Sequence, residues 1–255
     1  MDGLLAGDTA LVTGGANGIG LGIATEIARQ GARVAIADVN AQAGEAAART
    51  LGAHTDVTFL AADLRSREEA DRLAARAIET LGQVSILVHA ASPRRAETDT
   101  VFGVDDATFD AMFAVNVTAG FRLAQRIGRH MIDRRLAGRM LFTTSLHAER
   151  PRNLPHYAAA KAGLTMIVKE CARALGQHGI RVNALVPGAI ATGGVVTDPA
   201  IAKKIPLGRP GTPDDIAPMA VVMLCDRFSR YMTGASVVVD GGLDLYSWFD
   251  PPDIR

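Results

Sequence analysis

A tyrosine and a lysine stand four residues apart in the alanine-rich run HYAAAKAG, residues 156–163. Alanine is the strongest helix former, so this run predicts a helix that carries Tyr157 and Lys161 on one face. A free tyrosine titrates near pH 10, but a neighbouring ammonium stabilises the phenolate form of such a side chain. The pair therefore suits the transfer of a proton to and from a substrate hydroxyl.

Glycines follow the first predicted strand with a spacing that suits a phosphate-binding loop. They are Gly14, Gly18 and Gly20, in the run TGGANGIGLGIATEIA. Glycines let the backbone turn tightly and approach a pyrophosphate, and the N-terminus of the following helix offers unpaired N–H groups. Because a strand precedes this run and a helix follows it, we predict a dinucleotide site whose loop also includes Asn17 and Ile19.

A carboxylate at the end of the second predicted strand indicates which dinucleotide binds. Asp38 can accept hydrogen bonds from the adenosine ribose hydroxyls and repels a 2′-phosphate. Asn17 and Val39 occupy the positions where an arginine would bind such a phosphate, so we expect NAD as cofactor. Alternatively, Asp38 only caps the helix that follows. Asp63, which ends the third strand, and Leu64 beside it are expected near the adenine.

Both groups of residues need a scaffold, and the chain offers strands that alternate with helices. The strand candidates are TALVTG, ARVAIAD, VTFLAAD, VSILVHA, RMLFTTS, IRVNALVPG and ASVVVDGG. This alternation predicts an α/β fold, a doubly wound, Rossmann-like domain with a mainly parallel seven-stranded sheet and helices on both faces. The strands are continuously apolar, as is typical of a sheet covered on both sides.

The chain shows no tandem repeat, low-complexity segment or linker, so we expect a single domain over residues 1–255. Proline and glycine recur too often in residues 187–215 for a continuous helix, and this segment is a candidate substrate lid. An ordinary ordered surface loop is the alternative. Residues 243–255, LDLYSWFDPPDIR, hold the single tryptophan and two more aromatic side chains. Such a cluster at a terminus predicts a subunit interface.

Bulk composition excludes several classes of partner. Lys plus Arg and Asp plus Glu number 27 each, so the net charge is zero and nothing favours nucleic acid or an anionic membrane. Charges interrupt every apolar run before the roughly 18 residues that span a bilayer, and no signal peptide is visible. Cys171 and Cys225 have no CxxC spacing, which is typical of buried thiols in a reducing compartment. We expect a cytoplasmic protein that binds a small molecule and its own copies.

With these motifs in their order, the sequence resembles the short-chain dehydrogenase/reductase family from about residue 7 to residue 243. The resemblance matches the family's catalytic tetrad to Asn116 in FAVNVTAG, Ser145 in FTTSLH, Tyr157 and Lys161. It implies that Tyr157 exchanges a proton with the substrate oxygen while hydride passes to or from the nicotinamide. It further implies that Ser145 positions that oxygen, that Lys161 holds the nicotinamide ribose, and that Asn116 supports a water of the proton path.

The resemblance extends to the segment VPGAIAT after the sixth strand. It places Pro187 and Gly188 under the nicotinamide, and Ile190 and Thr192 near its carboxamide. Ala90, after the fourth strand, is also expected at the cofactor.

The chain departs from the family pattern at two places. VHAAS, from Val88 to Ser92, stands where the family usually has NNAG, so His89 replaces the first of two sheet-stabilising asparagines. This puts the local hydrogen bonding in question. Ser145 also precedes Tyr157 by one residue fewer than is usual in the family, a spacing that would select Thr144. We prefer Ser145, because a loop can lose a residue and the family's hydroxyl is normally serine.

Basic and polar residues surround the predicted site, in ASPRRAE after the fourth strand and in SLHAERPRNLPHY before the tyrosine. We expect Arg94, His147 and Arg152, together with Ser145 and Tyr157, to bind a hydroxylated or anionic substrate such as a sugar, polyol or sugar acid. The loop start also resembles that of some bacterial sugar and polyol dehydrogenases of the family. A solvated loop that contacts only water is the alternative.

Three other functions compete with a sugar or polyol dehydrogenase. A non-catalytic dinucleotide sensor would lack part of the tetrad, and a 3-oxoacyl thioester reductase would usually want NADPH and an arginine near position 17. A sugar-nucleotide epimerase would need a substantial C-terminal domain. The histidines show no ligand spacing such as HExxH, so we expect no metal. Family members are commonly tetramers, so the resemblance implies a homotetramer.

Overall fold

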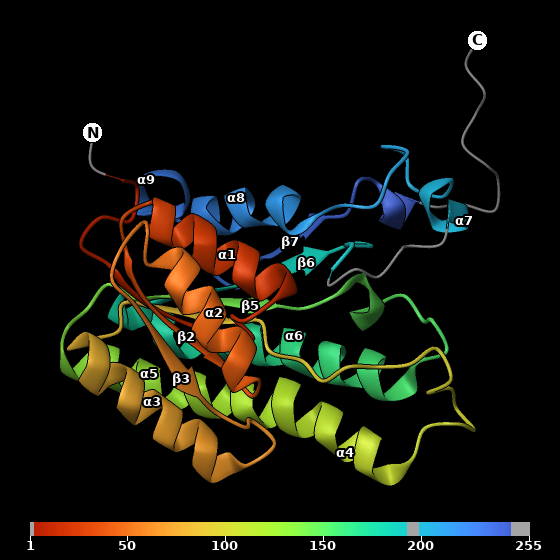
Figure 1. Ribbon diagram of the computed structural model, residues 1–255, viewed down its shortest axis with the longest axis horizontal. Coiled ribbons are helices and arrows are strands. Elements are labelled where there is room, and N and C mark those ends of the chain that lie inside the picture. Colours follow the sequence, from red (N-terminus) through yellow and green to blue (C-terminus); the bar gives the residue numbers. More distant parts are fainter. Residues whose placement is uncertain (1–2, 193–198, 246–255) are drawn as a thin grey trace.

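The computed structural model describes residues 3–192 and 199–245. Its strands form one sheet in the order β3-β2-β1-β4-β5-β6-β7, and every pairing is parallel (Figure 1). The strands are β1 (Thr9–Thr13), β2 (Arg33–Asp38), β3 (Val57–Ala61), β4 (Ile86–His89), β5 (Arg139–Thr143), β6 (Arg181–Pro187) and β7 (Ser236–Val239). Each of the seven predicted runs forms one of these strands, which confirms the predicted α/β architecture.

Helices cover both faces of the sheet (Figure 1). The longer ones are α1 (Gly18–Arg29), α2 (Ala41–Leu51), α3 (Arg67–Leu81), α4 (Asp106–Phe113), α5 (Gly120–Asp133), α6 (Pro155–Leu175) and α8 (Pro213–Leu224). The short ones are η1 (Ala114–Ala119), η2 (Leu146–Ala148), η3 (Gly176–His178), η4 (Leu243–Leu245), α7 (Pro199–Ala202) and α9 (Asp226–Ser229). No helix in the described part of the chain is long and apolar enough to cross a membrane.

Two hydrophobic cores hold the three layers together. On one face Ile23 and Ile27 of α1 and Ile216 of α8 pack against the sheet, and on the other Leu73 of α3 packs with side chains of α5 and α6. β1 and β6 are buried at every residue, because parallel strands in the middle of a sheet are covered on both faces. This explains why the central strands have apolar runs with no alternation.

Buried charges tie the amino ends of the strands together. Arg181 at the start of β6 is 10% exposed and pairs with Asp226 at 3.0 Å. Its guanidinium also donates to the carbonyl oxygens of Met223 and Leu224. Arg139 at the start of β5 pairs with both Asp8 and Asp226. These contacts lock β5, β6 and the end of α8 to the N-terminal segment.

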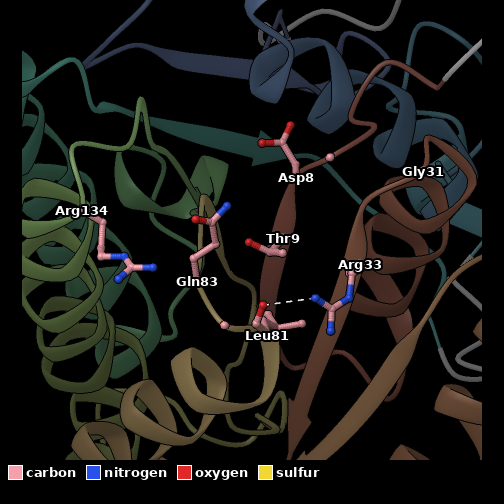
Figure 2. Close-up of a pocket in the computed structure, with 9 residues that line it drawn as sticks. Asp8, Thr9, Gly31, Arg33, Leu81, Gln83 and Arg134 are labelled. Atoms are coloured by element: carbon pink, nitrogen blue, oxygen red, sulfur yellow. Dashed lines mark hydrogen bonds between the residues drawn. The ribbon is translucent and has the colours of Figure 1, made fainter.

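A hollow of about 540 Å³ opens at the same amino-terminal edge of the sheet. Figure 2 shows Arg33 on its wall, with a hydrogen bond to the carbonyl oxygen of Leu81. Arg33 also pairs with Asp56 at 3.1 Å, so this charge already has partners within the fold. Ligands of open parallel sheets bind at the carboxyl ends of the strands, and none of the predicted site residues lines this hollow.

We expect Arg181→Met to lower the free energy of unfolding by about 2–4 kcal/mol, because it removes the donor to two buried carbonyl groups and leaves Asp226 with Arg139 as its remaining partner. Arg33→Met is the matched control: its ion pair is 45% and 64% exposed on the two sides, and such pairs contribute less than about 1 kcal/mol. Urea denaturation of both variants measures the difference. Equal losses would contradict a structural role for the buried network.

Candidate active site

The predicted site residues follow the carboxyl ends of the central strands. The glycine loop follows β1, Asp38 ends β2, His89 ends β4, and Ser145 comes two residues after β5. Pro187 ends β6. Because the strands are parallel, all of these positions meet at one edge of the sheet, opposite the hollow of Figure 2.

The glycine loop has the backbone that a dinucleotide site requires. Gly14 and Gly18 have φ of 66° and 55°, in the left-handed region that side chains disfavour. A Cβ on Gly20 would lie 2.1 Å from the carbonyl oxygen of Gly14, so only glycine lets α1 pack this closely under the loop. No side chain caps the N-terminus of α1, and its first turn holds no acid. Its N–H groups therefore fit an anionic pyrophosphate.

Tertiary folding brings other predicted cofactor residues to this loop. A Cβ on Gly18 would lie 3.3 Å from Thr192, and one on Gly14 would meet the backbone of Ala90 and Ala91. Ile19, in the first turn of α1, is partly buried and packs against the core. The segments after β1, β4 and β6 thus form one continuous surface.

Asp38 accepts hydrogen bonds from the backbone N–H groups of Ala16 and Asn40, at 3.2 and 3.1 Å. The N-cap of α2 is Asn40, whose side chain accepts from Ala43 N. Asp38 therefore does not act as the helix cap. It connects β2 to the glycine loop, and its oxygens retain acceptor capacity for ribose hydroxyls.

The two residues expected near the adenine, Asp63 and Leu64, already have partners within the fold. Asp63 accepts hydrogen bonds from the side chain and backbone of Arg65, which hold the pKa of this carboxyl below its ordinary value. Leu64 is buried in the core. The structure thus places both after β3, with the carboxylate already paired.

The predicted helix for the tyrosine and lysine is α6. Proline at its first position favours helix initiation here, and Tyr157 and Lys161 are 7% and 3% exposed. Lys161 Nζ lies 5.7 Å from the centroid of the Tyr157 ring and donates to the carbonyl oxygen of Thr143 at 2.8 Å. The hydrogen bond anchors the ammonium between the phenol and the end of β5.

Burial, and secondarily the Arg95 guanidinium, lower the pKa of Lys161 to about 7. The side chain is thus near the midpoint between its neutral and charged forms at neutral pH. An anion bound nearby would favour the charged form, which is the form that stabilises a phenolate.

The two hydroxyl candidates after β5 have different surroundings. Thr144 Oγ1 donates to the carbonyl oxygen of Leu185 on β6, at 3.4 Å. Ser145 Oγ accepts from the backbone N–H of His147 at 3.2 Å and keeps its own proton to donate. These contacts favour Ser145 as the residue that can bind a substrate oxygen.

Asn116 lies in η1, a π-helical turn between α4 and α5. Turns of this type occur frequently at functional sites. Its Nδ2 donates to Ser92 Oγ and to the carbonyl oxygen of Met112. Its Oδ1 is buried and has no hydrogen-bond partner among the described residues. This amide therefore presents a free acceptor inside the site.

His89 stands where the family usually has an asparagine, and it makes the hydrogen bonds that connect β4 to its neighbours at this point. Its Nδ1 lies 2.9 Å from Thr13 Oγ1 on β1, and its Nε2 lies 3.1 Å from the carbonyl oxygen of Val115 in the π-turn. A carbonyl can only accept, so Nε2 carries the proton and Nδ1 accepts from the threonine. Burial, and then the charge of Lys161, lower the pKa of His89 to about 4, so the ring is neutral at pH 7.

The structure distinguishes the basic residues expected at the substrate. Arg95, beside the predicted Arg94, lies over the Tyr157 ring with 4.2 Å from its guanidinium carbon to the ring centroid. Arg94 is exposed, and the described residues offer it no hydrogen bond or ion pair. Arg152 pairs with Glu97 at 2.6 Å. The sequence predicts both arginines near the substrate, and both side chains are exposed; the path of the loop decides that Arg95 is the one that contacts the phenol.

His147 packs edge-on against Tyr157, with 6.2 Å between ring centroids. Its Nδ1 lies 3.0 Å from the carbonyl oxygen of Arg150, which assigns the proton to Nδ1. Burial is the main reason that the pKa of His147 is below its ordinary value. A neutral imidazole is therefore one wall of the site.

The candidate lid, residues 187–215, is anchored at both ends. Ala191 N donates to the carbonyl oxygen of Gly211, and a Cβ on Gly188 would lie 2.6 Å from Asp240, so both segments pack closely. Residues 193–198 lie outside the described residues, as do residues 246–255 of the aromatic tail. The described start of that tail reaches the site loop through an ion pair between Asp244 and Arg150 at 2.7 Å.

Within residues 3–192 and 199–245, no three His, Cys, Asp or Glu side chains gather as metal ligands. Both cysteines are free and buried.

The comparisons with known proteins agree with this geometry. A family model described as enoyl-(acyl carrier protein) reductase matches residues 14–244. The fold and site define an oxidoreductase that uses a nicotinamide dinucleotide and acts on CH–OH groups. The chain belongs to the short-chain dehydrogenase/reductase family.

Relatives in this family span nearly the whole chain. L-rhamnose 1-dehydrogenase (NAD(P)(+)) of Azotobacter vinelandii is 34% identical over 94% of this chain and 98% of its own length. A 3-oxoacyl-(acyl-carrier-protein) reductase of Chlamydia pneumoniae is 35% identical over 95% of this chain and 99% of its own. The crystal structure of a putative short-chain alcohol dehydrogenase from Sinorhizobium meliloti has a TM-score of 0.89 at 32% identity, covering 95% of this chain and 98% of that one.

We expect the stability advantage of the wild type over His89→Gln to shrink by about 2 kcal/mol between about pH 7.5 and about pH 5. Below pH 6.5 the unfolded histidine binds a proton that the folded one, with its pKa of about 4, does not bind. Stability from this ring is therefore fully present above pH 6.5 and is lost as the pH falls toward 4. Urea denaturation of both proteins at the two pH values measures the change, and a constant difference would show that His89 is not held neutral.

Proposed function

We propose that the protein is an NAD-dependent dehydrogenase that interconverts a secondary alcohol and a carbonyl on a sugar, polyol or sugar acid. The observation that carries this proposal is the arrangement of Ser145, Tyr157 and Lys161 beside the glycine loop at one edge of the sheet. Bound NAD would supply the hydride acceptor, with its pyrophosphate at the N-terminus of α1 and its nicotinamide against Pro187, Gly188 and the segment that follows.

The side chains of the site then move the proton and position the substrate. In the oxidation direction Tyr157 takes the hydroxyl proton, and Ser145 donates a hydrogen bond to the same oxygen and so positions it. Lys161 stabilises the phenolate and reaches the nicotinamide ribose. Asn116, with its free buried acceptor, holds the water through which the proton leaves.

Asp38 supports NAD over NADP. A carboxylate beside the glycine loop would repel a 2′-phosphate, and Asn17 and Val39 offer no positive charge to offset it. The name of the Azotobacter relative includes both cofactors, so the preference of this chain depends on its own residues.

A homotetramer would cover apolar side chains that the single chain exposes. Phe121 on α5 is 44% exposed and Met166 on α6 is 55% exposed. Both helices also pack in the core, so a partner subunit would cover only their outer faces. The aromatic tail is proposed as a further part of the interface.

We expect Tyr157→Phe to lower kcat at least about 1,000-fold while NADH still binds, because the acid/base group is lost and the ring is kept. Tyr231→Phe is the control, since Tyr231 is fully exposed. The assay is NAD reduction over a panel of sugars, polyols and sugar acids. Turnover that survives in Tyr157→Phe would contradict the mechanism. NADH binding without turnover would favour a sensor, and turnover only with acyl thioesters and NADPH would favour a 3-oxoacyl thioester reductase.

We expect Asp38→Asn to raise the KM for NAD about tenfold and to lower the KM for NADP, because the variant keeps the shape of the side chain and removes its charge. Steady-state rates with both cofactors measure the ratio. An unchanged ratio would show that Asp38 does not contact the adenosine ribose.

A further inference from the structure

Arg95 is an exposed cation that lies against the Tyr157 ring. Its guanidinium carbon lies 4.2 Å from the centroid of the Tyr157 ring. In the part of the chain that the structure describes, no carboxylate forms an ion pair with it. A contact with the face of an aromatic ring does not neutralise a guanidinium, so the charge of Arg95 remains available to a ligand.

The two acids of the same loop are directed to other partners. Glu97 pairs with Arg152 at 2.6 Å. Asp99 Oδ2 lies 3.6 Å from Nε2 of His156, which is fully buried at the start of α6. Both contacts hold the loop after β4 against the loop before α6. They therefore keep Arg95 over the phenol without neutralising it.

Of the acids near the Tyr157 ring, Glu97 is paired with Arg152 and Asp99 faces His156, so neither pairs with Arg95. Arg95 contributes to the lowered pKa of both Lys161 and His147, which shows that its charge acts on both sides of the Tyr157 ring. Arg150 is already paired with Asp244. An oxidised nicotinamide would bring one further positive charge. A neutral polyol would leave this charge uncompensated, whereas an anionic substrate would offset it.

We propose that Arg95 is the specificity-determining residue of this site and selects substrates that carry a carboxylate close to the reacting carbon. The planar guanidinium can bind a carboxylate through two parallel N–H···O bonds. Because it lies over the phenol that handles the carbinol oxygen, the bound carboxylate belongs to the part of the substrate that reacts. The inference rests on the proposed function and narrows its substrate to hydroxy acids such as sugar acids.

The test compares matched ligands that differ only in a carboxylate. D-gluconate and D-glucitol, D-galactonate and galactitol, and D-glycerate and glycerol are titrated by ligand-observed NMR into the full chain, with and without NADH. The proteins are the wild type, Arg95→Gln, Arg95→Lys and Arg173→Gln. Arg173→Gln is the matched control, because it removes the same charge from an exposed position in the last turn of α6, at the other end of the helix from Tyr157.

We expect the wild type to bind at least one acid more tightly than its neutral counterpart. Arg95→Gln should weaken that acid about 10- to 100-fold and leave the neutral ligand unchanged within about twofold. Arg95→Lys should keep part of the acid affinity, and Arg173→Gln should match the wild type. Loss of the acid preference together with unchanged neutral binding separates recognition of the charge from a merely structural role of the loop.

Two results would overturn the proposal: no pair with a preference for the acid, or a preference that persists in Arg95→Gln. Binding requires no reaction, so these results are independent of the turnover assay. Failure of the proposed function would instead appear as the absence of turnover that depends on Tyr157.

Discussion

The site depends on the burial of a lysine beside a tyrosine. Lys161 has one protein hydrogen bond, to the Thr143 carbonyl, and burial lowers its pKa to about 7. Burying an ammonium is costly unless partners offset the loss of water. β5 provides the carbonyl, and α6 carries both side chains. A bound anion near Lys161 would favour its charged form, and a bound cation would favour its neutral form. Ligand binding is therefore coupled, through this residue, to the acid/base chemistry of Tyr157.

A neutral imidazole also lies near Lys161. His89 stands close enough for the lysine to lower its pKa, and it remains uncharged while it joins Thr13 of β1 to the π-turn. Gly120 makes room for the ring, since a Cβ there would lie 3.0 Å from His89 Cδ2. His89 thus stands where the family usually has asparagine, and its one donor and one acceptor join the π-turn that holds Asn116 to β1.

The two loops over Tyr157 show how a chain of zero net charge can still build a charged site. Of the four arginines in these loops, Arg152 and Arg150 pair with Glu97 and Asp244, whereas Arg94 and Arg95 form no ion pair within the described part of the chain. Of these two unpaired arginines, Arg95 is the one that contacts the ring of Tyr157. Local pairing, and not overall composition, therefore sets the potential that a substrate meets.

Local patterns determined the elements of this protein. The apolar runs predicted all seven strands, the glycines predicted the turn from β1 into α1, and the spacing of Tyr157 and Lys161 predicted one helical face, because each of these features depends on residues close in sequence. Tertiary structure decided the rest. Asn40, and not Asp38, caps α2, Arg95 lies over the Tyr157 ring, and His89 has a hydrogen-bond partner 76 residues away. Contacts of this range depend on how loops pack across strands, which no local pattern encodes.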